Sequence, residues 1–127
     1  MSDHMRVYKI LIIDDDKTLH ATLKPVLGAN GFDIVSAYSG EEGLEQVLAE
    51  KPDLILLDVI MPGIKGRDVC RRLKADPVTA DIPVLFLTAK NSDDDIRAEI
   101  DAGAAGHITK PVNSMPLVRQ IKKTLGV

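Results

Sequence analysis

Short apolar runs alternate with longer amphipathic segments along the chain, and this alternation occurs five times. The apolar runs lie at residues 8–13, 32–35, 54–57, 83–87 and 106–108. Three of these runs contain at least four consecutive apolar residues, as strands buried on both faces of a parallel sheet do. The pattern therefore predicts five strands in one parallel sheet.

The segments between the runs have the spacing of amphipathic helices. Helices are expected at residues 17–29, 43–50, 66–74, from 92 onward, and from 113 or 114 to about 125. Ser39 and Glu42 have the spacing of a capping box, and the helix that follows is expected to bury Leu44, Val47 and Leu48. Because crossovers between parallel strands are right-handed, the sequence predicts an α/β fold with a doubly wound five-stranded parallel sheet and five helices.

Size and composition fit one small globular domain. The chain has 127 residues, a net charge of −3 and a single cysteine, Cys70, whose position on an apolar helix face suggests packing. We expect residues 1–6 to be a disordered or tag-derived N-terminus and residues 7–127 to form the domain. No basic patch, long apolar stretch or signal peptide is visible, so we expect a cytoplasmic protein that binds neither nucleic acid nor membrane.

Polar residues follow four of the five predicted strands. These residues are Asp14, Asp15 and Asp16 after the first strand, Asp58 after the third, Thr88 after the fourth and Lys110 after the fifth. In doubly wound sheets the ligand binds beyond the carboxyl ends of the strands, so these side chains are expected to converge. Two carboxylates about 4 Å apart repel by about 4 kcal/mol at an effective dielectric constant of about 20. Three carboxylates together therefore call for a cation, and their oxygen ligands favour Mg²⁺.

The other two side chains suit phosphoryl transfer. Lys110 could clamp a transferred phosphoryl group, and Thr88 could offer its hydroxyl to one oxygen of that group. A carboxylate is a competent nucleophile for such a transfer.

These motifs resemble the receiver domain of two-component response regulators. The matching segments are Ile10 to Asp16, Leu57 to Pro62, Gly66, Leu87 to Ala89, and Lys110 with Pro111. The anchor positions Asp15, Asp58, Thr88 and Lys110 are separated by 43, 30 and 22 residues, close to the spacing usual in that family.

The resemblance implies a flavodoxin-like strand order of 2-1-3-4-5 and a phosphorylation site at Asp58. The phosphoryl group would come from a phosphohistidine of a sensor kinase or histidine phosphotransfer protein. Asp15 and Asp58 would bind Mg²⁺ by their side chains, Ile60 by its backbone carbonyl and Asp14 through water. Thr88 and Lys110 would contact the phosphoryl oxygens, with a cis peptide bond before Pro111.

The family also implies a switch. His107 stands where an aromatic switch residue often occurs, although it could equally be a half-buried polar ring. The surface of residues 92–125 would change shape and signal to a downstream protein or output domain, with a homodimer linked to phosphorylation as one further assembly. Ile60 and Lys90 occupy positions that often modulate the lifetime of the phosphoryl group. The resemblance implies a signalling domain that assists its own phosphorylation and dephosphorylation, and not an enzyme with a separate substrate.

Two alternatives fit parts of the sequence. Asp14 to Thr18 also fits the Asp-x-Asp-x-Thr signature of haloacid dehalogenase-type phosphohydrolases, with Asp14 as the nucleophile. That class needs acidic metal ligands after the lysine, whereas no Asp or Glu follows Lys110. The second alternative is a degenerate receiver that binds partners without being phosphorylated, against which the full set of site residues argues.

Overall fold

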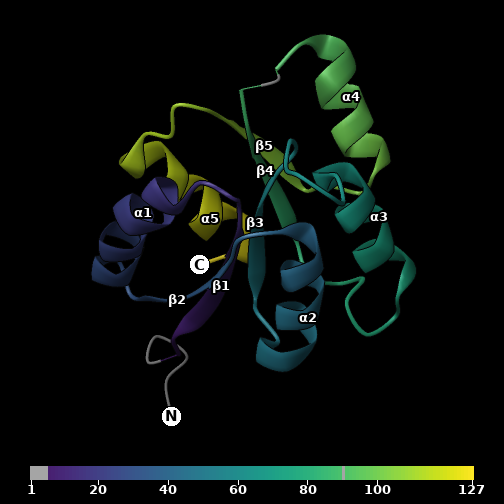
Figure 1. Ribbon diagram of the computed structural model, residues 1–127. Coiled ribbons are helices and arrows are strands. Elements are labelled where there is room, and N and C mark those ends of the chain that lie inside the picture. The colour runs from purple at the N-terminus through teal and green to yellow at the C-terminus, as the bar shows by residue number, and fades with distance from the viewer. Residues whose placement is uncertain (1–5, 90) are drawn as a thin grey trace.

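The computed structural model describes residues 6–89 and 91–127, in which five strands alternate with five helices (Figure 1). The strands are β1 (Tyr8–Ile13), β2 (Phe32–Ala37), β3 (Leu54–Asp58), β4 (Val84–Thr88) and β5 (Gly106–Thr109). The helices are α1 (Lys17–Ala29), α2 (Gly40–Glu50), α3 (Gly66–Ala75), α4 (Asp93–Asp101) and α5 (Ser114–Leu125). The predicted alternation of strands and helices is confirmed.

All strand pairs are parallel, and the strand order is β2-β1-β3-β4-β5. This is the order that the family resemblance implied. The chain leaves β1 toward β2 on one side and later returns to β3 on the other, so the order reverses between β1 and β3. Ile13 is paired with Leu57 in the register, which brings the next residues, Asp14 and Asp58, to the same edge of the sheet.

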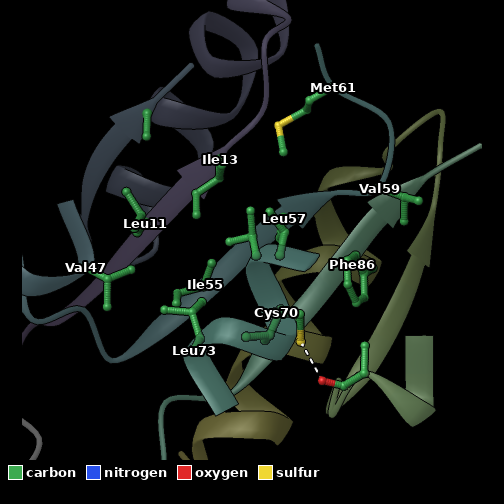
Figure 2. Packing of buried hydrophobic residues seen from close by; sticks show 14 residues of the cluster. Leu11, Ile13, Val47, Ile55, Leu57, Val59, Met61, Cys70, Leu73 and Phe86 are labelled. Atoms are coloured by element: carbon green, nitrogen blue, oxygen red, sulfur yellow. Dashed lines mark hydrogen bonds between the residues drawn. The ribbon is translucent and has the colours of Figure 1, made fainter. Parts of the chain in front are cut away.

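Helices cover both faces of the sheet (Figure 1). Alternate strand residues point to opposite faces and build two separate cores. The core under α1 and α5 contains Ile10, Ile12, Leu54, Leu56, Leu85 and Leu87 from the sheet. The core under α2 and α3 contains Leu11, Ile13, Ile55, Leu57 and Phe86, with Cys70 donating from Sγ to the Ala102 carbonyl (Figure 2). Each such buried side chain contributes about 1.5–3 kcal/mol, so the strands hold a rigid edge for the residues that follow them.

Two local expectations for α2 are not fully met. Leu48 is 58% exposed, because it lies at the edge of the buried stripe that Val47 occupies. The Ser39 capping box forms only in part: Ser39 accepts from the Glu42 N–H, but the Glu42 carboxylate accepts from the N–H of Tyr38. A complete capping box forms instead at the start of α4, between Ser92 and Asp95.

Residues 1–5 and Lys90 lie outside the described residues, so the expectations for them stay untested. Arg6 donates to the carboxylate of Asp53. None of the helices in residues 6–89 and 91–127 is long and apolar enough to span a membrane.

Candidate functional site

Three carboxylates meet at the carboxyl edge of the sheet, where the strand order reverses. Asp14 and Asp15 follow β1 and Asp58 ends β3, and one oxygen from each lies within 4.8 Å of the others. Asp14 and Asp58 are buried, whereas Asp15 is exposed. The predicted convergence of these three residues is confirmed by their positions. Their hard oxygen donors and concentrated negative charge fit a divalent cation such as Mg²⁺.

Both carboxylate oxygens and the backbone N–H of Asp14 form hydrogen bonds within the protein. Its side chain is fully buried; Oδ1 accepts from the N–H of Asp16 at 2.9 Å and Oδ2 accepts from Nζ of Lys110 at 2.9 Å. The Asp14 N–H donates to the carbonyl of Ala37 at 3.1 Å. Because both carboxylate oxygens are engaged within the protein, Asp14 is the least accessible of the three acids.

Asp58 is the buried acid that faces the centre of the site. Only 7% of the residue is exposed, and Oδ1 accepts from the N–H of Ile60 at 3.4 Å. Burial raises the pKa of Asp58, and the neighbouring charge of Asp14 raises it further, although Lys110 opposes both effects. Ionised Asp58 is therefore under-compensated by the protein alone, as expected of a carboxylate that also faces a cation.

Gly66 allows the chain to pass close to Asp58. Its N–H donates to the Val59 carbonyl at 2.9 Å, and a Cβ atom at this position would lie 2.0 Å from the Asp58 carbonyl oxygen. Only glycine can start α3 at this distance from the end of β3. The glycine that the sequence singled out thus has a steric role beside the predicted acceptor.

Lys110 crosses the site from the loop after β5. Its ammonium lies 2.9 Å from Asp14 and 3.5 Å from Oδ2 of Asp58. Burial alone lowers the pKa of Lys110, but the hydrogen bond and charge of Asp14, with those of Asp58, outweigh it and raise the pKa. The lysine stays charged and partly neutralises two carboxylates. The peptide bond between Lys110 and Pro111 is cis, as expected.

Thr88 ends β4 beside Lys110. The residue is 1% exposed, and its carbonyl accepts from the N–H of Lys110 at 2.9 Å. Thr88 is paired with Thr109 in the register, so the end of β4 and the start of the lysine loop form one unit. Four strand ends thus supply the three carboxylates, the threonine and the lysine that the sequence predicted would converge.

Comparison with known proteins decides what kind of domain carries this arrangement. The chain matches the response regulator receiver domain over residues 10–122. It belongs to this family. Receiver domains of response regulators accept phosphoryl groups in two-component signalling, so the signalling class expected from the sequence is confirmed. The match leaves the phosphohydrolase alternative without support.

Relatives of this receiver domain include regulators of transcription. The chain is 38% identical over 116 residues to the transcriptional regulatory protein AfsQ1 of Streptomyces coelicolor, covering 91% of this chain and 50% of that protein. It is 37% identical to the phosphate regulon transcriptional regulatory protein PhoB of Pseudomonas aeruginosa, covering 91% and 51%. The chain spans about half the length of these curated relatives.

A solved structure supports the fold of the receiver domain. A two-component response regulator from Clostridium difficile superposes with a TM-score of 0.88 at 33% identity, covering 94% of this chain and 96% of that one. The agreement extends over nearly the whole chain. The flavodoxin-like arrangement with strand order 2-1-3-4-5 is thereby confirmed.

His107 of the receiver domain is bound to a buried carboxylate. The ring lies on β5 with 15% of its side chain exposed, and Nδ1 lies 2.5 Å from Oε1 of Glu99, which is 1% exposed on α4. Neither Nε2 of His107 nor Oε2 of Glu99 has a hydrogen-bond partner among the described residues. His107 is thus half-buried, and it links α4 to β5.

Sequence reasoning missed two buried titratable residues, Glu99 and His20. Both lie on the buried stripes of their helices: Glu99 follows Ile96 by three residues, and His20 precedes Leu23 and Leu27 by three and seven residues. Helical spacing could therefore have identified both as buried titratable groups. Their partners could not have been identified, because those partners lie on other elements.

The acidic cluster at the start of α4 is not part of the site. Asp93 and Asp94 are exposed, and Asp95 caps the helix with Ser92 while accepting from Arg67 at 3.1 Å. Among the described residues, the only group of three acids, histidines or cysteines close enough to share a metal ion is Asp14, Asp15 and Asp58. The interpretation of residues 93–95 as a solvated helix start is confirmed.

Proposed function

We propose that this receiver domain takes a phosphoryl group onto Asp58 from a phosphohistidine of a sensor kinase or histidine phosphotransfer protein. The observation that carries the proposal is the placement of Lys110 between Asp14 and Asp58, in a cluster whose three acids approach within 4.8 Å. Each neighbour of Asp58 then has a distinct role, either in the transfer of the phosphoryl group or in binding its oxygens afterwards.

In the transfer step, one carboxylate oxygen of Asp58 forms a bond to phosphorus while the bond from phosphorus to the donor's imidazole nitrogen breaks. The electron pair of the broken bond returns to the imidazole. Lys110 lies 3.5 Å from the Asp58 carboxylate and can pair with the phosphoryl oxygens as they arrive. The Thr88 hydroxyl, at the end of the neighbouring strand, can contact another of those oxygens.

Asp15 and Asp58 would hold Mg²⁺ by their side chains, with the Ile60 carbonyl as a further ligand and Asp14 acting through water. Bound Mg²⁺ supplies positive charge that offsets the carboxylates and the incoming phosphoryl oxygens. The protein's own contribution is positional: Asp14 is fixed by Asp16 and Lys110, and Asp58 is fixed by the end of β3. The pKa of Asp58 is raised without a metal, so the site is arranged to gain from a cation.

The switch would run through Thr88 and His107. Thr88 is joined to the Lys110 loop by a backbone hydrogen bond, and His107 lies three residues before Lys110. A cavity of about 230 Å³ between α4 and β5 is lined by Glu99, Ile100 and His107, which gives the ring room to change position. Contacts of the phosphoryl group with Thr88 and Lys110 would bias the surface of α4, β5 and α5 toward a second state, which signals to a downstream protein or output domain.

Acetyl phosphate tests the acceptor. Wild-type protein incubated with acetyl phosphate and Mg²⁺ is expected to gain a single phosphoryl group by intact-mass spectrometry, and Asp58→Asn is expected to gain none. Asp33→Asn is the matched control, since Asp33 is an exposed acid near the opposite end of a strand. Equal uptake by Asp58→Asn would refute the acceptor, and no uptake by wild type would support a degenerate receiver.

A further inference from the structure

The ring of His20 is buried beside the site and bonded through both nitrogens. His20 lies on α1 with 2% of the residue exposed. Nε2 is 2.7 Å from the backbone carbonyl oxygen of Asp14, and Nδ1 is 2.9 Å from Oγ of Ser36 on β2. The ring also packs against Tyr38, with 4.5 Å between ring centroids. The imidazole therefore connects α1, β2 and the end of β1.

These contacts fix the ring's hydrogen-bonding pattern. A carbonyl oxygen can only accept, so Nε2 of His20 must carry the proton that it donates to Asp14. In the neutral ring, Nδ1 then accepts from the Ser36 hydroxyl. The Asp14 carbonyl thus sets the tautomer, and the Ser36 hydroxyl, which can donate or accept, satisfies Nδ1 and holds the ring in this orientation.

The Asp14 carbonyl belongs to the peptide plane that also contains the N–H of Asp15. The N–H of Asp14 is held by Ala37, and its carboxylate by Asp16 and Lys110. His20 supplies the remaining contact, on the carbonyl. This contact fixes the orientation of the peptide plane between Asp14 and Asp15. Because that plane ends at the Cα atom of Asp15, it also restricts the direction in which the Asp15 side chain leaves the backbone.

The position of the Asp15 carboxylate depends on this backbone more than the positions of the Asp14 and Asp58 carboxylates do. It is exposed, and no hydrogen bond from the described residues holds its carboxylate. Asp14 and Asp58, by contrast, are buried, and both contact Lys110. The position of the Asp15 oxygen in the three-acid cluster is therefore set by the backbone on which it is carried.

We infer that His20 is a positioning residue for the cation site: its hydrogen bond to the Asp14 carbonyl fixes the Asp14–Asp15 peptide and keeps Asp15 directed at Asp58. The inference rests on the proposed function, since it requires that these acids bind a divalent cation. Outer contacts of this kind commonly change metal affinity by about 10–100-fold when they are removed. A ring that served only as packing for Tyr38 would affect stability and leave metal affinity unchanged.

The test is the affinity for Mn²⁺ alone, measured from the electron paramagnetic resonance signal of the free ion, because Mn²⁺ accepts the same oxygen ligands as Mg²⁺. His20→Leu removes both hydrogen bonds and should weaken binding by about tenfold or more. His20→Gln places an amide N–H near the position of Nε2 and should restore affinity to within about threefold of wild type. Ser36→Ala keeps the ring but removes its orienting hydroxyl, and it should weaken binding by about threefold or more.

Thr79→Val is the matched control. Thr79 is 3% exposed and its hydroxyl donates to the Leu73 carbonyl at 2.7 Å, in the segment between α3 and β4. Its removal also deletes a buried bond from a side chain to a carbonyl, so it should lower stability while leaving the Mn²⁺ affinity at the wild-type value. A loss of affinity in this control equal to that of His20→Leu would refute the inference.

The outcomes separate the inference from the function on which it rests. Asp15→Asn should weaken Mn²⁺ binding strongly; if wild type binds no Mn²⁺, or Asp15→Asn binds as wild type does, the cation site itself fails and the inference with it. If Asp15 matters but folded His20→Leu binds with wild-type affinity, only the role of His20 is refuted. Should His20→Leu fail to fold by circular dichroism, Ser36→Ala decides: weaker binding supports the inference, and wild-type affinity overturns it.

Discussion

The ammonium of Lys110 donates to the carboxylate of Asp14 at 2.9 Å, across 96 residues of sequence. The two residues follow β5 and β1, which are separated in the sheet by β3 and β4. The lysine therefore reaches across the carboxyl ends of the central strands. This one contact ties the first strand end to the last and passes over Asp58, which lies 3.5 Å from the same ammonium.

Lys110→Met is expected to lower the free energy of unfolding at pH 7 by about 2 kcal/mol in the absence of metal. The fully buried carboxylate of Asp14 would lose its cation, and removing one partner of a buried pair costs more than the intact pair contributes. The raised pKa of Lys110 means that its contribution is present at all pH values below the ordinary value of 10.5 and is lost only as pH rises through the raised pKa. Urea unfolding at pH 7 measures the effect.

The double variant Asp14→Asn/Lys110→Met provides the control, since it removes both charges. It is expected to be more stable than Lys110→Met alone, with a coupling free energy of about 1 kcal/mol or more. Strict additivity of the two single variants would contradict the interpretation that Lys110 neutralises Asp14.

Asp58→Asn is expected to raise stability without metal, and the gain should depend on pH. The pKa of Asp58 is raised by burial and by Asp14, so the folded state binds the proton more tightly than the unfolded chain. Wild-type stability therefore falls as pH rises through the window from 3.8, the ordinary value, to the raised value. The advantage of the asparagine variant should grow across this window and be largest above the raised pKa of Asp58.

Urea unfolding of both proteins between about pH 4 and 8 checks this prediction, and a difference that does not vary with pH would contradict it. Mg²⁺ provides an internal check. A ligand at about 100 times its Kd stabilises the state that binds it by about 2.7 kcal/mol, which should reverse the order of stability if only wild type binds.

Gly66→Ala is expected to destabilise the domain by about 2–4 kcal/mol and to slow phosphorylation by acetyl phosphate. The added Cβ would lie 2.0 Å from the Asp58 carbonyl oxygen, so either α3 or the end of β3 must move. Gly28→Ala is the matched control, because nothing lies within 4 Å of its Cβ position on α1. That change should be neutral or stabilising by up to about 1 kcal/mol. Equal effects of the two substitutions in urea unfolding would refute the steric argument.

Much of this arrangement could be predicted because the apolar runs that identify the strands also determine where the residues that follow them lie. Continuous apolar runs such as Leu54–Leu57 identify buried parallel strands, and parallel strands bring their following residues to one edge. That rule predicts that Asp14, Asp58, Thr88 and Lys110 lie at the same edge of the sheet. The strand order came from family resemblance, because hydrophobic periodicity is the same for every order of the same five strands.

The parts that could not be predicted depend on contacts between elements. Leu48 has the helical spacing of a core residue, yet it is exposed because it lies at the edge of the buried stripe of α2, next to Val47. The carboxylate of Glu42 accepts from the N–H of Tyr38, in the turn that leaves β2, and not from the N–H of Ser39. The pairing of Glu99 with His107 and of His20 with Asp14 joins separate elements, and spacing within one helix carries no information about such partners.

The last prediction concerns the pair of Glu99 and His107. Glu99 is 1% exposed and its Oε1 lies 2.5 Å from Nδ1 of the ring, so the histidine is the group that compensates this buried carboxylate. His107→Phe keeps an aromatic ring on β5 but removes the hydrogen bond, and it is expected to lower the free energy of unfolding by about 2–4 kcal/mol. The double variant Glu99→Leu/His107→Phe also removes the buried carboxylate that has lost its partner, and it should recover most of that loss, which urea unfolding will measure.

If the pair also connects α4 to the phosphorylation site, beryllofluoride, a mimic of the phosphoryl group, should shift the NMR signals of the His107 ring in wild type. The same addition should shift the amide signals of α4 less in the double variant than in wild type. The hydrogen bond that joins α4 to β5 is then replaced by an apolar contact, which does not fix the relative orientation of the two side chains. Ring signals that do not move with beryllofluoride, together with equal α4 shifts in both proteins, would show that the pair stabilises the fold and plays no part in switching.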